Sequence, residues 1–199
     1  MPVRQVRSVT RQERILDAAL DVFAEHGYQQ ATVDDIASTA RTSKGGIYFH
    51  FPGKDAIFLA LLDRSANLLL ARVGERVSAE SDPIAKVDAA LLALVRTFGS
   101  HRALARLFLV ESRGAGPKLH SRLVDVQARF AAFVKQQLDE AVSQGLVAPF
   151  DTEVASQAWF GALNQVVTVW ALAEHPRPLE ETYPHLRSLL LRSIGLLDR

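Results

Sequence analysis

Apolar residues recur at helical spacing along most of this chain, and no segment shows the strict alternation of a half-buried strand. Glycine, proline and short polar residues separate the periodic segments. The pattern predicts an all-α protein, with helices at about residues 11–26, 33–40, 44–51, 54–78, 83–98, 101–113, 117–144, 152–174 and 184–197.

Two of these helices are short and closely spaced. Thr32 precedes the first, with Asp35 three residues later, an arrangement typical of a capping box at a helix start. After a break, Ser43 can cap the second helix, in which Ile47 and Phe51 share a face. Residues 33–52 are therefore predicted to form a helix-turn-helix, whose second helix can enter a DNA major groove.

The second short helix carries side chains that can donate hydrogen bonds or charge to phosphates and base edges. Two adjacent glycines interrupt it at a cost of about 1 kcal/mol each against alanine, which favours a role in close approach to DNA. Lys54, at the start of the next helix, is a candidate phosphate ligand together with the free backbone amides there. The alternative is a plain helical hairpin with Tyr48 and Phe49 as core aromatics.

With residues 10–28 included, the order and spacing of these residues resemble one known family. The patterns T-x4-I-x2-A-A-x3-F-x3-G-Y, T-V-x2-I-A-x2-A and S-K-G-x-I-Y-x-H-F-x2-K are similar to the DNA-binding domain of TetR-type repressors. The resemblance implies an all-helical homodimer with an N-terminal three-helix, helix-turn-helix DNA-binding domain. A larger helical domain for ligand binding and dimerisation would follow. The positions that match the family's DNA-facing places are Thr32, Ser43, Lys44, Gly45, Gly46, Tyr48, His50 and Lys54.

One departure from the family pattern lies in the turn. Arg41 and Thr42 stand where the family usually has glycine and valine, and we add both to the predicted DNA-binding residues. Glycine tolerates a positive φ there, whereas arginine carries a steric cost. Either the turn differs in this chain, or Arg41 accepts strain in exchange for a phosphate contact.

The resemblance also predicts the domain organisation: an N-terminal tail and DNA-binding domain over residues 1–54, and a ligand-binding and dimerisation domain over residues 55–199. The helix at 152–174 is apolar almost all round, so it must be covered from two directions, by its own domain and by a second subunit. A monomeric core is the alternative. The residues predicted at the dimer interface are Ala158, Gln165, Val169, Leu172, Leu186, Leu190 and Ile194.

A small-molecule pocket is expected among the middle helices, because such pockets are mostly apolar with a few polar groups. The candidate lining residues are Leu62, Phe98, Leu107, Phe108, Glu111, Arg113, Phe130, Phe133, Trp159 and Asn164. Residues 104–134, 145–147 and 159–172 are similar to the ligand domain of fatty-acid-degradation regulators in the TetR group. That resemblance implies a long-chain acyl-CoA or fatty acid as effector, with Arg102, Arg106, Arg113 or Arg129 near its phosphates. The rival is a regulator of efflux that responds to aromatic or drug-like ligands.

Composition narrows the functional classes. The chain has 199 residues, is 48% hydrophobic and carries a net charge of only +1, which indicates a globular protein. Four arginines in the first 14 residues suggest an irregular tail that contacts DNA. No cysteine, catalytic constellation, metal-ligand pair or cofactor motif is present, so an enzyme built on a helical bundle is a distant alternative. A third interpretation is an architectural DNA-binding dimer without an effector. The sequence shows no N-terminal signal segment, and its long charge-free run is interrupted by polar residues. We therefore expect a cytoplasmic protein that does not enter membranes.

Overall fold

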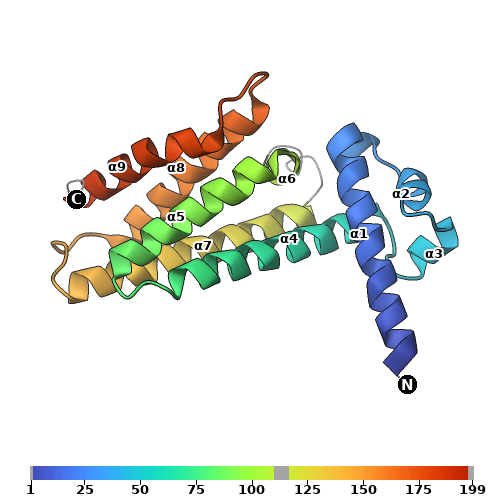
Figure 1. Cartoon of the computed structure of the whole chain (residues 1–199), viewed down its shortest axis with the longest axis horizontal. Helices are drawn as coiled ribbons and strands as arrows, with labels where there is room; N and C mark the ends of the chain where they lie inside the picture. Colours follow the sequence, from blue (N-terminus) through green and yellow to red (C-terminus); the bar gives the residue numbers. More distant parts are fainter. Residues whose placement is uncertain (1, 110–116, 197–199) are drawn as a thin grey trace. The chain divides into compact units, whose positions relative to one another are not determined.

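The computed structural model describes residues 2–109 and 117–196, with side chains from residue 11 onward except at 117–119, and its described residues contain no strand. The prediction of an all-α fold is therefore confirmed (Figure 1). The elements are α1 (Pro2–Gln30), α2 (Val33–Thr39), α3 (Lys44–Tyr48), α4 (Lys54–Val77), α5 (Pro83–Ser100), α6 (Arg102–Leu109), α7 (Pro117–Ser143), α8 (Thr152–Leu172), the 3-10 helix η2 (Leu179–Thr182) and α9 (Tyr183–Ser193).

The first helix is longer than the sequence pattern indicates. Its backbone is already helical at Pro2, so the expected irregular tail is wrong. Arginine, glutamine and glutamate are good helix formers, and no glycine occurs between Pro2 and Gly27 to end the helix. Gly27, with φ of 73°, breaks the helical geometry as its position predicts.

The cap residues define the other helix starts. Thr32 and Ser43 cap α2 and α3 through their side chains, and Asp82 caps α5, whose first residue is Pro83. Helix α3 ends at Tyr48, three residues before the end expected from its apolar face, because Pro52 lacks a backbone N–H and disfavours helical geometry in the residue before it.

The chain forms two compact units, one made of residues 1–66 and 106–122 and the other of 67–105 and 123–199. In the first unit α2 packs on α1 and α3 on α2 (Figure 1). A group of buried aromatic rings holds this unit together: the centroid of Phe58 lies 5.2 Å from Phe23, 4.8 Å from Tyr28 and 5.6 Å from Phe108.

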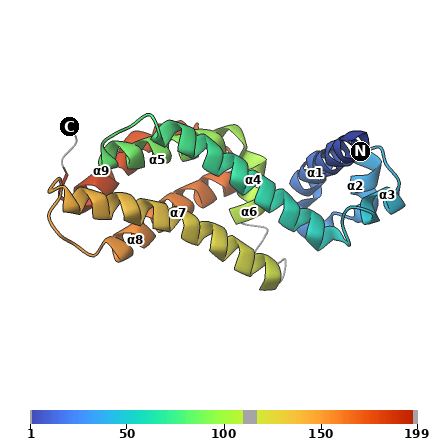
Figure 2. The ribbon, with the colours of Figure 1, turned by 90° about the horizontal axis from the view of Figure 1, so that it is seen from below.

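In the second unit α5 packs against η2 and α9, while α7 and α8 cross each other (Figures 1 and 2). Val95, Leu138, Val167 and Leu179 are fully buried in it. The 3-10 helix η2 has no counterpart among the predicted elements. None of the helices in the described parts of the chain is long and apolar enough to cross a bilayer.

Candidate nucleic-acid interface and apolar cavity

The turn between α2 and α3 keeps a glycine-type geometry although an arginine occupies it. Arg41 has a φ of 52°, in the left-handed region. Its amide donates to the carbonyl of Ser38 (3.0 Å), and the amide of Thr42 donates to Ala37 (3.0 Å). This pair of bonds is a Schellman motif with arginine at the position that glycine usually takes. The alternative of a different turn is therefore excluded, and the Arg41 side chain is exposed to solvent.

Thr32 forms a complete capping box. Its hydroxyl accepts from the amide of Asp35 (3.2 Å), and the Asp35 carboxylate accepts from the amide and hydroxyl of Thr32 (3.0 and 2.6 Å). The two bonds that its carboxylate accepts from Thr32, from the hydroxyl first and then from the amide, lower the pKa of Asp35. The Thr32 side chain is thus engaged in starting α2, and its exposed position leaves one face of the cap open to a phosphate.

The two glycines of α3 are explained by different surroundings. A Cβ on Gly46 would lie 2.6 Å from the hydroxyl of Thr42, and the Gly46 amide donates to the capping hydroxyl of Ser43 at 3.1 Å. Inside the protein, a Cβ on Gly45 would meet only the Ser43 hydroxyl, at an ordinary 3.9 Å. The contact with Thr42 therefore explains why position 46 has no side chain, whereas no contact in the described chain requires a glycine at position 45.

Helix α3 presents aromatic side chains to solvent. Ile47 and Phe51 are buried, but Tyr48 is 48% exposed and Phe49 is 77% exposed, with its ring 5.0 Å from that of half-buried His50. The alternative in which Tyr48 and Phe49 fill a hairpin core is therefore wrong. Because successive helical residues are turned by about 100°, Phe49 points away from buried Ile47.

The two lysines have protein partners. Lys44 forms an exposed ion pair with Asp34 at 2.8 Å, and the hydrogen bond to Asp34 raises the pKa of Lys44. Lys54 donates to the carbonyls of Tyr28 (2.8 Å) and Gln29 (3.1 Å) at the end of α1 and lies 4.7 Å from the centre of the Tyr28 ring. Lys54 therefore joins α1 to α4, in addition to any phosphate contact.

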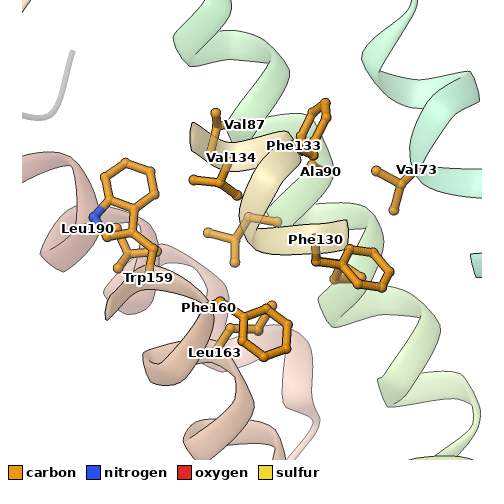
Figure 3. A pocket seen from close by; sticks show the side chains of 12 residues that line it. Val73, Val87, Ala90, Phe130, Phe133, Val134, Trp159, Phe160, Leu163 and Leu190 are labelled. Carbon is orange, nitrogen blue, oxygen red and sulfur yellow. The ribbon is translucent and has the colours of Figure 1, made fainter. Parts of the chain in front are cut away.

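The second unit holds an apolar cavity of about 40 Å³ between α4, α5, α7, α8 and α9 (Figure 3). Phe130, Phe133 and Trp159, three of the predicted ligand residues, line it, whereas Phe98 and Asn164 do not. Leu62, Leu107 and Phe108 are buried in the first unit, and Glu111 and Arg113 lie outside the described residues.

Of the arginines suggested for effector phosphates, Arg102 has a clear structural role. Its guanidinium donates to the carbonyls of Ala171 and Ala173 at the end of α8 and lies over the Trp170 ring. Arg129 is exposed on α7, Arg106 is exposed on α6, and Arg113 lies outside the described residues.

The predicted dimer residues separate into two groups. One group lies exposed along α8, as expected of a surface that a second subunit covers: Ala158, Gln165, Val169 and Leu172. Leu186 and Leu190 of α9 and its C-cap residue Ile194 are instead buried within the protomer, and the exposed leucine of α9 is Leu189, at 60%. An open groove of about 480 Å³ lies between α8 and α9, with Leu186 and Leu189 among its walls.

Comparison with protein families assigns the chain. The model described as "Bacterial regulatory proteins, tetR family" matches residues 15–61, and "Tetracyclin repressor-like, C-terminal domain" matches residues 80–192. This protein belongs to the TetR family. The membership confirms that it is a DNA-binding transcriptional regulator and not an enzyme.

Several TetR relatives are similar along nearly the whole chain. The fatty acid metabolism regulator protein of Bacillus subtilis (strain 168) is 24% identical over 182 residues, which are 91% of this chain and 94% of the relative. The structure of the fatty acid degradation regulator FadR from Bacillus halodurans has a TM-score of 0.84 and 27% identity, covering 92% of this chain and 98% of that one. The fold also matches FadR from Bacillus subtilis in complex with stearoyl-CoA, with a TM-score of 0.85, 24% identity, and coverage of 92% and 99%.

Two features of the DNA-binding domain were not predicted from the sequence. Phe49 is the most exposed large apolar side chain in the described residues, and its place opposite Ile47 on the helix was the available signal. Asp34 pairs with Lys44 across ten positions of sequence, for which no helical spacing gives a signal. Both lie beside the predicted DNA-binding residues, which stay predictions.

Proposed function

We propose that this TetR-family protein is a homodimeric repressor that binds an inverted-repeat DNA operator and is released by a small lipophilic effector, a long-chain acyl-CoA. The observation that carries the DNA-binding part is the outer face of α3. It combines a glycine that no internal contact requires with exposed Lys44 and Tyr48, and exposed Phe49 follows at the C-cap.

The contacts divide by chemistry. Exposed Arg41 and the amides and hydroxyls at the starts of α2 and α3 suit phosphates, which fix position without reading sequence. Tyr48 and Lys44 can reach base edges, and the exposed ring of Phe49 suits a thymine methyl group. To contact DNA, Lys44 must give up its ion pair with Asp34. Part of the attraction between Lys44 and DNA therefore only offsets the loss of that pair.

Two copies are needed to read an inverted repeat, with recognition helices about 34–36 Å apart. The exposed Val169 and Leu172 on α8 and Leu189 on α9 support pairing through these two helices. This arrangement keeps the predicted α8 contribution and replaces the buried α9 leucines with Leu189.

The apolar cavity supports the effector class. Its lining is aliphatic and aromatic, as the tail of an acyl-CoA requires, and the similar fatty acid regulators support the same class (Figure 3). A cavity of 40 Å³ is far smaller than the roughly 150 Å³ that holds benzene in a protein core. The effector must therefore bind an expanded form, and it acts through its higher affinity for that form than for the DNA-binding form.

The test begins with selection of an operator from random duplex DNA, followed by titration with fluorescence anisotropy and with light scattering for the assembly. We expect a dimer bound to an inverted repeat, and release on addition of palmitoyl-CoA. Tyr48→Ala should abolish specific binding while the matched control Tyr183→Phe, in the other unit, binds normally. A monomer, or unchanged binding by Tyr48→Ala, would contradict the DNA-binding proposal. Release by aromatic ligands alone would contradict the acyl-CoA assignment.

A further inference from the structure

Phe160 on α8 borders two separate spaces in the second unit. It lines the apolar cavity described above (Figure 3), and it also lines an open groove of about 430 Å³ formed by α7 and α8. Among the residues that line these two spaces, Phe160 is the one they share. Its ring therefore forms part of the wall between the apolar cavity and the groove.

The Phe160 ring is stacked on the ring of Phe130. The rings of Phe160 and Phe130 are nearly parallel, with an interplanar angle of 20° and centroids 6.4 Å apart. Phe130 is buried, whereas Phe160 is half-buried. Rotation of the Phe160 side chain toward the groove would break one aromatic contact, which contributes only about 0.5–1.5 kcal/mol beyond burial.

The neighbouring aromatic residue of α8, Trp159, is fixed more firmly. Trp159 is 5% exposed, and its indole Nε1 donates to the hydroxyl of Ser193 on α9 at 3.0 Å. Its ring is therefore tied to α9, while the neighbouring Phe160 ring has no such bond. Of these two aromatic walls, Phe160 is the one that can move without breaking a hydrogen bond.

The groove outside combines small apolar side chains with a few polar ones. Three alanines of α7, at 128, 131 and 132, give it a floor without bulky side chains. Gln157 and Lys135 stand at its edges, where Gln157 bonds to Glu153 (2.9 Å) and Lys135 to Asp139 (2.7 Å). The groove therefore offers polar groups beside an apolar floor, which a linker containing amides could contact while an apolar chain occupies the cavity.

From this arrangement we propose that Phe160 is the gate of the effector site: the acyl chain enters the cavity between α7 and α8 when the Phe160 ring leaves Phe130, and the polar linker stays in the groove. The effector class rests on the proposed function, whereas the gate rests on the two spaces and the ring between them.

The gate can be tested without an effector. Trp170→Phe leaves Trp159 as the remaining tryptophan, so its fluorescence reports on the cavity. In this background, Phe160→Ala should raise the acrylamide quenching constant of Trp159 severalfold, with Phe160→Leu intermediate. Leu163→Ala is the matched control, because Leu163 lines the cavity but not the groove, so its loss should enlarge the cavity without joining it to the groove. Leu163→Val replaces it if the alanine variant unfolds in circular dichroism.

The second arm measures palmitoyl-CoA association by stopped-flow fluorescence of Trp159. Phe160→Ala should speed association severalfold, and Leu163→Ala should not. Increased quenching without palmitoyl-CoA binding by any variant would support the gate and overturn the effector class. Quenching in Phe160→Ala no greater than in the control would overturn the gate. Binding at an unchanged rate would also overturn it, because the ligand would then enter elsewhere.

Discussion

Replacing Gly45 by alanine should strengthen the fold and weaken DNA binding. Gly45 lies in the first turn of α3 with a φ outside the positive region, and the new Cβ would meet nothing closer than 3.9 Å. Alanine gains up to about 1 kcal/mol over glycine in a helix, which corresponds to a rise in melting temperature of about 2–4 °C for a chain of this size. On DNA, the added methyl group holds α3 away from the groove floor.

The expected loss of affinity is larger than the gain in stability. Displacing α3 weakens base-edge contacts that contribute about 1–3 kcal/mol each, so the affinity for the selected operator should fall at least about tenfold. Scanning calorimetry and anisotropy titration at fixed salt give the two quantities on one preparation. Gly46→Ala is the control, because its Cβ would press on the Thr42 hydroxyl at 2.6 Å and cancel the stability gain. A Gly45→Ala protein that is more stable and binds DNA normally would refute the close approach of α3.

Three further substitutions probe other parts of the molecule. Arg41→Gly should raise the free energy of unfolding by about 1 kcal/mol, because glycine tolerates the left-handed backbone at this position. If Arg41 contacts a phosphate, the slope of log affinity against log salt should also fall by about 1 in this variant. Arg41→Lys should keep the stability and the salt slope of the unmodified protein. Lys54→Met should lower the free energy of unfolding by roughly 1–3 kcal/mol, measured in urea, since two carbonyls of α1 lose a charged donor, and an unchanged midpoint would contradict this. Burial, then the hydrogen bond to Asp88, raises the pKa of Tyr183 from 10.0 to about 12, so its stabilisation is complete below pH 10 and is lost as pH rises toward 12. Tyr183→Phe should flatten the fall in melting temperature over that range, and equal slopes would refute the linkage.

The helix starts could be predicted because they depend on local chemistry. Thr32 with Asp35, Ser43, and Asp82 before Pro83 satisfy backbone donors within three or four residues, and the sequence displays that spacing directly. The geometry of the turn at Arg41 was harder to predict, because the family pattern indicates a glycine-type φ while arginine disfavours it. Local hydrogen bonds to Ser38 and Ala37 outweigh that preference in the folded turn.

Features that depend on which surface faces which partner were not predictable. Helix α9 has leucines on several sides, so apolar character alone could not show that Leu186 and Leu190 face the protomer core while Leu189 faces outward. The roles of Lys54 and Lys44 depend on groups 26 and 10 positions away, respectively, and such pairs leave no periodic signal. The size of the apolar cavity is set by side-chain packing, which a pattern of apolar positions does not contain.

The arginine in the turn also affects how firmly the recognition helix is held. A glycine at position 41 would leave the backbone many conformations, whereas a residue with a Cβ that has been forced into the left-handed well has few others within reach. The angle between α2 and α3 should therefore fluctuate less than in a turn built on glycine. Less ordering entropy is then lost when α3 settles into a groove, so strain that weakens the free protein helps to preorganise its DNA-bound form.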